Sequence, residues 1–327
     1  MATSTKSQFV IYDEQFYAGR VERLEQNIRA FNENSRGCIE LRSNFHEGDF
    51  SQESFFQKGN HVYDRDPTSI SAQTATGLAM DEVKSPKVNK GYLIESTLDS
   101  FKKLGRDDRE MSYVLGQQLG DEIMQKYLNT AMYTLLGGFS ASAVASQLVY
   151  TGLSASSITS IGLNNGLRLF GDAAERIQMW VMHSKVYRDL VENQITEKLL
   201  EVTAGVLYGG NPATYNRPVL VMDNPALISA GSSTASSADD VYHTFGLTRS
   251  AVTIEESEES SVLAETVGGK HNIIARLQGE FAYTVKMKGM SFSAAANPSD
   301  GTLATGTNWS KKFADKKSLM GIDIQTR

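Results

Sequence analysis

Histidine and serine side chains are the residues of this sequence best suited to catalytic chemistry. Its histidines are His46, His61, His183, His243 and His271. No pair of them shows the His-Glu-x-x-His spacing that binds zinc on one helix face. His183 and Ser184 follow a short apolar run, but adjacent residues of a strand point to opposite sides, so they cannot form a nucleophile–base hydrogen bond. We therefore favour a structural role for both, with Ser184 as the N-cap of a helix over residues 185–190.

A serine hydrolase is the alternative from a different class of protein, and it would use Ser184 with His243 or His271. The motifs that would support such an enzyme are missing. Residues 138–142 (Gly-Phe-Ser-Ala-Ser) fail the nucleophile-elbow pattern at the last position. Residues 268–270 (Gly-Gly-Lys) precede His271, whereas a phosphate-binding loop requires Ser or Thr there.

A run of carboxylates could attract a cation. Its members are Glu255, Glu256, Glu258 and Glu259. A calcium loop needs alternating Asp or Asn ligands and a glycine turn, which this run lacks, so we expect a solvated edge or loop. The sequence thus predicts no catalytic, cofactor-binding or metal-binding residues.

Composition limits the class of protein. The 327 residues carry a net charge of −6, with 40% hydrophobic and 21% charged residues, which is typical of a globular chain. Nothing indicates the strong basic face of a nucleic-acid-binding protein. The only cysteine, Cys38, cannot form an internal disulfide, and residues 1–10 lack the apolar run of a signal peptide. We expect synthesis and folding in a cytoplasm.

One helix dominates the predicted elements. Between residues 107 and 136, apolar residues recur at helical spacing at Met111, Leu115, Leu119, Ile123, Tyr127, Ala131 and Leu135. Such a helix is about 45 Å long, and Gly137-Gly138 would end it. Residues 127–167 contain no charged residue and no histidine. Their many serines argue against a membrane span, so this stretch is expected to be buried against protein, within the subunit or between copies.

The region before this helix predicts an arm and a loop. Residues 14–31 have helical spacing and Gly37 would close that helix. Residues 64–76 are polar except for Ile70, and such a long irregular stretch is typical of a functional loop. Residues 80–92 suggest a ribbon whose Lys84, Lys87 and Lys90 form a basic edge, so we expect a projecting hairpin.

The rest of the chain alternates helix and strand patterns and then becomes β-rich. We predict a helix over 157–171 with Ile158, Ile161, Leu167 and Leu169 inward, a strand over 177–182, a helix over 185–193 and a strand over 218–222. Further strands are expected at 251–254, 281–287 and 319–324. Together these elements form a compact α/β insert followed by a β-rich tail.

This order of parts resembles the major capsid proteins of tailed bacteriophages, with the Hong Kong 97-type fold. The most specific segments are 166–176 (Gly-Leu-Arg-Leu-Phe-Gly-Asp-Ala-Ala-Glu-Arg) and 177–190. Segments 217–225 and 245–251 (Phe-Gly-Leu-Thr-Arg-Ser-Ala) also look similar. The resemblance implies an α+β fold with an N-terminal arm (1–36), an extended E-loop (37–92), a P domain with a spine helix (93–136), an A domain (137–250) and P-domain return strands (251–327).

The resemblance also implies a function. The chain would self-assemble into hexamers and pentamers of an icosahedral shell around double-stranded DNA, need no cofactor, touch DNA only weakly and have no membrane partner. It would be made and assembled in the bacterial host cytoplasm and end in the virion. The short arm favours a separate scaffolding protein, with a portal and a decoration protein as further partners. Lys–Asn crosslinks cannot be matched, so none is predicted. An encapsulin-like nanocompartment is the alternative on the same fold.

Overall fold

The structure is a computed structural model that describes residues 13–57, 59, 62, 64–65, 67–72, 74–75, 77–97, 108–202, 214–215, 217–229, 240–268, 271 and 274–327. Its α-helices are α1 (Asp13–Asn34), α3 (Asp108–Ser140), α4 (Ser142–Leu148), α5 (Ser160–Arg168), α6 (Ser184–Val202) and α7 (Asp300–Ala304). Its strands are β1 (Ile39–Ser43), β2 (Phe50–Phe56), β3 (Met80–Thr97), β4 (Val149–Leu153), β5 (Ile177–Met182), β6 (Val219–Val221), β7 (Ile228–Ser229), β8 (Val241–Thr248), β9 (Val252–Val267), β10 (Ile274–Met287), β11 (Met290–Phe292), β12 (Trp309–Lys311) and β13 (Gly321–Thr326).

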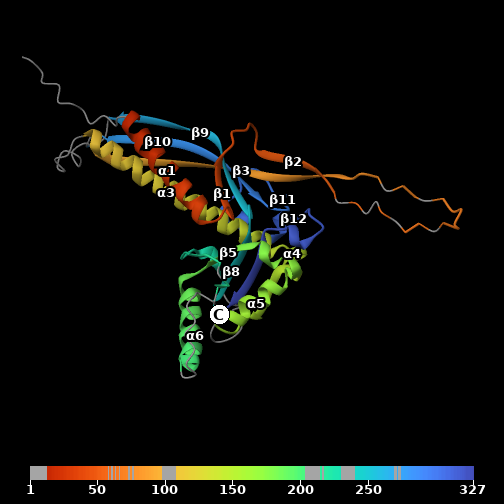
Figure 1. The fold of residues 1–327 in the computed structure, drawn as a ribbon. Coiled ribbons are helices and arrows are strands. Elements are labelled where there is room, and N and C mark those ends of the chain that lie inside the picture. Colours follow the sequence, from red (N-terminus) through yellow and green to blue (C-terminus); the bar gives the residue numbers. More distant parts are fainter. Residues whose placement is uncertain are drawn as a thin grey trace, which may run out of the picture.

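The first sheet has the strand order β1-β9-β10-β3-β2. Its long central strands, β9, β10 and β3, pair antiparallel, while β1 joins β9 in parallel with Ile39 opposite Val252. Helices α1 and α3 lie side by side along this sheet (Figure 1). Tyr127 of α3 packs edge-on against Tyr283 of β10, with ring centroids 4.9 Å apart. The helix pair thus supplies the apolar cover that one sheet face needs.

The predicted long helix is present, and its apolar stripe faces inward. Leu119, Ile123, Tyr127, Ala131 and Leu135 are all buried. At 33 residues, α3 is about 50 Å long.

The predicted end of the long helix at Gly137-Gly138 is wrong, because α3 continues to Ser140. A Cβ atom at Gly137 would lie 2.0 Å from the carbonyl oxygen of Leu303, and one at Gly138 would lie 2.3 Å from Sδ of Met287. The two glycines therefore serve close packing against α7 and β10, not helix termination.

The second sheet has the strand order β4-β13-β8-β5-β6, and β7 also pairs with β8, with Ile228 opposite Tyr242. Strand β5 has the predicted limits of residues 177–182. The final strand, β13, pairs with β4 and β8, so residues 321–326 lie in the second sheet and not with the preceding tail strands. The tail strands of the first sheet are longer than predicted, since β9 has 16 residues and β10 has 14.

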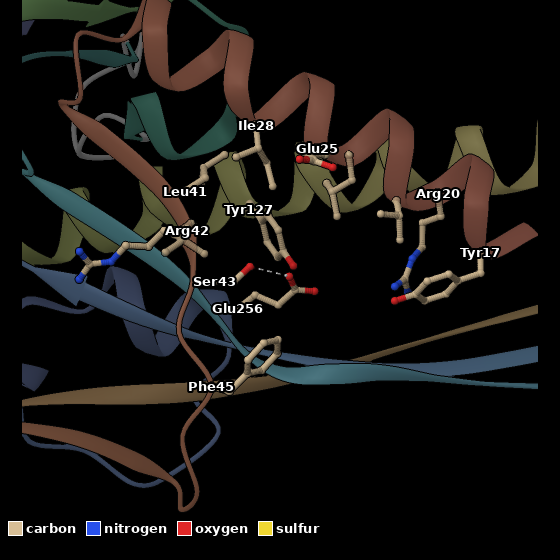
Figure 2. A pocket seen from close by; sticks show the side chains of 13 residues that line it. Tyr17, Arg20, Glu25, Ile28, Leu41, Arg42, Ser43, Phe45, Tyr127 and Glu256 are labelled. Carbon is tan, nitrogen blue, oxygen red and sulfur yellow. Dashed lines mark hydrogen bonds between the residues drawn. The ribbon is translucent and has the colours of Figure 1, made fainter.

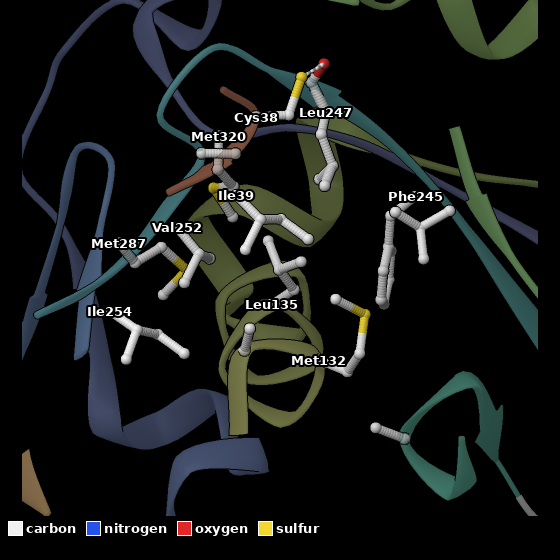
Figure 3. Packing of buried hydrophobic residues seen from close by; sticks show 14 of the residues in the cluster. Cys38, Ile39, Met132, Leu135, Phe245, Leu247, Val252, Ile254, Met287 and Met320 are labelled. Atoms are coloured by element: carbon white, nitrogen blue, oxygen red, sulfur yellow. Dashed lines mark hydrogen bonds between the residues drawn. The ribbon is translucent and has the colours of Figure 1, made fainter. Parts of the chain in front are cut away.

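One continuous apolar core joins the two sheets. Figure 3 shows Met132 and Leu135 of α3 between Val252 and Met287 on one side and Phe245 on the other. Cys38 lies at the edge of this cluster and is fully buried. Burial raises the pKa of its thiol to about 12, which keeps it protonated and unreactive. The shared core fixes the second sheet relative to the long helix.

Helix α5 is shorter than predicted, and one of the residues predicted to face inward is exposed. It begins at Ser160, where the Thr159 side chain accepts a hydrogen bond from the Gly162 amide. Ile158, Leu167 and Leu169 are buried or half-buried as predicted, but Ile161 is 68% exposed. The prediction failed there because it extended helical periodicity across residues 157–159, which precede the helix.

Candidate assembly surfaces

Residues 57–79 form a projecting arm between β2 and β3. The two strands pair antiparallel up to Phe56 opposite Met80, and the Gln57 amide still donates to the Ala79 carbonyl at 2.8 Å. Beyond this point the two sides of the projecting arm extend away from the two sheets (Figure 1). Every residue of the projecting arm that the structure describes is exposed. The projecting hairpin expected from the polar sequence is thus present.

The projecting arm nevertheless carries apolar side chains without cover. Val62 is 85% exposed, Leu78 is 74% exposed and Ile70 is 103% exposed. A folded monomer gains nothing from holding such side chains in water on an extended segment. This pattern is typical of a segment that binds another protein surface.

The predicted basic edge at the base of the projecting arm is wrong. Lys87 is only 5% exposed and forms an ion pair with Glu258 of β9. Lys84 lies over the ring of Phe50, with its Nζ 3.6 Å from the ring centroid. Strand β3 is covered on both faces here, because β11 packs on it and the Lys84 amide donates to Ser291 Oγ at 3.0 Å. Lys84 and Lys87 of β3 therefore do not form an exposed basic row.

The predicted solvated carboxylate run is wrong for Glu255, which lies within β9 and is fully buried, whereas Glu258 is exposed. Arg42 Nε donates to Glu255 at 2.8 Å, Asn44 Nδ2 donates at 2.9 Å and Lys286 Nζ lies 3.0 Å away. Burial would raise the pKa of Glu255, but these hydrogen bonds outweigh it and hold the pKa below its usual range. This cluster links β1, β9 and β10. The positively charged side chains of Arg42 and Lys286 lie against Glu255, where a metal ion would have to bind.

A cavity of about 330 Å³ opens between α1 and β1, which we call the α1–β1 cavity. Its apolar lining comes from Val21, Leu24, Ile28, Leu41 and Ile254. Figure 2 shows Tyr17 and Phe45 flanking it, with Tyr127 and Glu256 at its inner side. Tyr17 is 43% exposed and Phe45 is 61% exposed. An apolar cavity with exposed aromatic residues at its rim is suited to a single apolar side chain.

The uncharged stretch over residues 127–167 divides into two parts. Its first part, in α3, is buried within the subunit, as Ala131, Met132 and Leu135 show. Its second part exposes an uncharged surface on and around α4 and α5. This uncharged face comprises Ser140, Ser142, Ala143, Ser146, Gln147, Thr151, Gly152, Ser154, Ala155, Ser156, Ser157, Ile161 and Asn164.

The histidines do not assemble as the hydrolase alternative requires. His243 binds Ser229 and Asp323: its Nε2 lies 2.7 Å from Ser229 Oγ and its Nδ1 lies 2.8 Å from Asp323 Oδ2. Ser184 instead donates its amide to Asp223 at 3.2 Å. Sequence analysis missed Ser229 and Asp323, because they are 14 and 80 residues from His243 and no short motif links them.

The Ser229–His243–Asp323 chain has the order of groups found in serine hydrolases, with a half-buried serine but a buried histidine and aspartate. His243 is 4% exposed and Asp323 is 1% exposed. Burial lowers the pKa of His243, yet the Asp323 carboxylate outweighs it and leaves the pKa raised overall. The chain links β7, β8 and β13 across the second sheet.

The other histidine and serine residues considered in the sequence take the following positions. His183, and not Ser184, caps α6, because its Nδ1 accepts from the Lys185 amide at 3.2 Å. His271 is exposed, and His61 lies outside the described residues. Among the residues that the structure describes, no three His, Cys, Asp or Glu side chains gather as a metal site. In the same part of the chain, no helix is long and apolar enough to cross a membrane.

Comparison with known proteins identifies the family of the chain and proteins of similar fold. The family model described as "Major capsid protein 13-like" matches residues 8–322. No curated protein sequence matches the chain. Among solved structures, the chain is similar to the capsid of cyanophage Pam1 (TM-score 0.56, 14% identity, 88% of each chain) and to that of Ralstonia phage GP4 (0.54, 12%, 90% of each). It also matches the acid-stable capsid of Helicobacter pylori bacteriophage KHP30 (0.51, 10%, 88% of each).

At these low identities, the structural matches establish the mixed helix and sheet fold alone. The family match covers nearly the whole chain. The projecting arm with its uncovered apolar side chains is what a subunit of a shell needs. The chain therefore belongs to the major capsid protein 13-like family and forms a capsid shell.

Proposed function

We propose that this protein builds the hexamers and pentamers of an icosahedral shell that encloses the double-stranded DNA of a tailed bacteriophage. The projecting arm is the observation that carries this proposal. Its apolar side chains, Val62, Ile70 and Leu78, are exposed in the single subunit. Contact with a neighbouring copy would remove them from water and order the arm at the same time.

We further propose a division of the subunit that follows the capsid resemblance and the sheet topology. Residues 1–36 would act as the N-terminal arm, with α1 held along α3. The E-loop would narrow from 37–92 to about residues 57–79, because β1, β2 and β3 all belong to the first sheet. The P domain would comprise the first sheet with α3 as its spine helix. The A domain would comprise residues 137–250 together with β13.

The uncharged face fits a contact between copies in such a shell. Its residues lie on one region of the proposed A domain and carry no charge that a neighbour would have to pair. A surface of small polar side chains can be brought against a second copy without burying an unpaired ion.

The proposed partners follow from assembly. A separate scaffolding protein would guide closure, a portal would occupy one vertex and a decoration protein could bind outside. The net charge of −6 favours weak contact with packaged DNA, since a strongly basic wall would hold the genome. Assembly would take place in the host cytoplasm and the finished protein would reside in the virion.

We propose no catalytic activity for this subunit. The buried position of His243 supports that proposal, since a hydrolase must offer its histidine as well as its serine to a substrate. Labelling with a fluorophosphonate probe tests it directly. We expect no labelling of the native protein, and labelling that disappears in a Ser229→Ala variant would refute the proposal.

Sedimentation of two variants tests the role of the projecting arm. A short Gly-Ser linker in place of residues 64–76 should leave circular dichroism unchanged, because the described residues of that segment are exposed. The yield of shells should fall sharply, with and without scaffolding protein. A shortened protein that assembles as well as wild type would remove the arm from the interface, and one that cannot fold would place it in the core.

A further inference from the structure

We propose, on the basis of the shell function above, that the α1–β1 cavity of one subunit receives Ile70 from the projecting arm of a second copy of this chain. The shell function requires that arms touch neighbours, but it does not say where they bind. The cavity and the exposed isoleucine supply that missing contact.

Ile70 is presented outward at the far part of the projecting arm. Its neighbours Ser69 and Ser71 form a local turn, in which the two hydroxyls lie 2.7 Å apart and the Ser71 amide donates to Ser69 Oγ at 3.3 Å. Ile70 is fully exposed, and it is the only large aliphatic side chain among the described residues from 64 to 75. The arm therefore ends in one apolar side chain framed by small polar residues.

The α1–β1 cavity offers a matching environment. At about 330 Å³ it has room for a branched aliphatic side chain, since a cavity of about 150 Å³ already holds a benzene-sized group. Leu24, Leu41 and Ile254 of the lining are buried. The residues over 67–72 (Pro-Thr-Ser-Ile-Ser-Ala) carry no charge, so their approach would not set a like charge against Arg20, Glu25 or Glu256.

The donor must be a second copy. The projecting arm runs away from the body on the side opposite to the outer end of α1, so it leads away from its own cavity (Figure 1). Other exposed apolar side chains, such as Ile161 on α5, lie on the body of the subunit.

Disulfide crosslinking tests this contact. Ile70→Cys combined with Tyr17→Cys, on the rim of the cavity, should give dimers and longer ladders when assembled shells are oxidised mildly. A disulfide needs Cα atoms about 4.4–6.8 Å apart, so the crosslink reports close contact. Native Cys38 is buried and its thiol pKa is raised to about 12, so it will not compete. The matched control joins Ile70→Cys with Val221→Cys, which is 41% exposed against 43% for Tyr17 and lies in β6 of the second sheet, outside the uncharged face.

The outcomes are distinct. Ladders from the Tyr17 pair in shells, and none in unassembled subunits or in the control, would support the docking site. Shells without Tyr17 ladders, ladders of equal strength in the control, or an intramolecular bond in single subunits would overturn it while leaving the shell function intact. Ladders between Val10→Cys and Tyr17→Cys in place of the Ile70 pair would assign the cavity to the N-terminal residues and also overturn it. Failure of the wild-type chain to form shells would instead refute the proposed function.

Two further variants give a result even if the double-cysteine chains do not assemble. Ile70→Ser should raise the protein concentration needed for assembly by about tenfold or more, because each copy loses one buried aliphatic side chain. Val21→Trp fills the cavity from its own side and should do the same, while circular dichroism and the melting temperature of the free subunit remain normal. Thr74→Ala, elsewhere on the projecting arm, is the control and should assemble as wild type. Normal assembly by both Ile70→Ser and Val21→Trp would overturn the docking site.

Discussion

Replacing Gly137 with alanine offers a sharp test of how α3 is packed, because two accounts of this glycine predict opposite signs. If Gly137 sat unpacked within the helix, alanine would stabilise the protein by up to about 1 kcal/mol through its higher helix propensity. The structure instead places the new Cβ atom 2.0 Å from the Leu303 carbonyl oxygen and 2.8 Å from Nε1 of Trp309. Both atoms belong to a hydrogen bond, from Trp309 Nε1 to Leu303, that would have to move.

The expected cost of that movement outweighs the propensity gain. Overpacking a rigid site costs about 1–3 kcal/mol, and here the obstacle is backbone, which yields less than a side chain. We therefore expect the free energy of unfolding of Gly137→Ala to fall by about 1–3 kcal/mol. Urea denaturation of the unassembled subunit measures it as a lower midpoint at an unchanged slope. Ser140→Ala, at the exposed end of the same helix, is the control and should stay within about 0.5 kcal/mol of wild type. A Gly137→Ala protein as stable as wild type would refute the packing argument.

Other changes test the remaining parts of the structure. Lys87→Glu should lower the free energy of unfolding by about 3 kcal/mol or more, because it buries a carboxylate beside Glu258, whereas Lys87→Met should cost much less; equal melting temperatures for both would show that Lys87 is not buried. His243 has a raised pKa in the folded state, so its contribution should be fully present below the unfolded value of about 6.5 and be lost as pH rises through the folded pKa. A His243→Gln variant should therefore show a flatter stability–pH curve from about pH 6 to 8, and an unchanged slope would contradict the His243–Asp323 pair. Ser146→Arg, on the uncharged face, should leave subunit stability within about 0.5 kcal/mol of wild type but reduce shell yield, and unchanged yield would exclude Ser146 from the contacts between copies.

Local sequence patterns predicted the elements whose causes are local. The stripe from Leu119 to Leu135 identified α3, and the apolar run over 177–182 identified β5, because burial on one element leaves its own periodicity. The polar stretch around Ile70 likewise predicted a segment with few contacts inside its own subunit. These features depend on neighbours a few residues away.

The errors concern residues whose partners are distant in the sequence. Glu255 was expected in solvent because Arg42 lies 213 residues away, and without that partner a charged residue is expected outside. Gly137 was expected to end α3 because its packing partner, Leu303, is remote. The Ser229–His243–Asp323 chain was missed for the same reason, since strand pairing between β7, β8 and β13 creates it.

Electron microscopy of the expressed protein tests the central claim most directly. The structure shows a subunit with a projecting arm, an uncharged face and an open apolar cavity, and each of these is expected to close against another copy. We predict capsomers or closed icosahedral shells in the micrographs, in the presence of scaffolding protein if not alone. Only single 35.9 kDa subunits at high concentration, with and without scaffolding protein, would contradict the account.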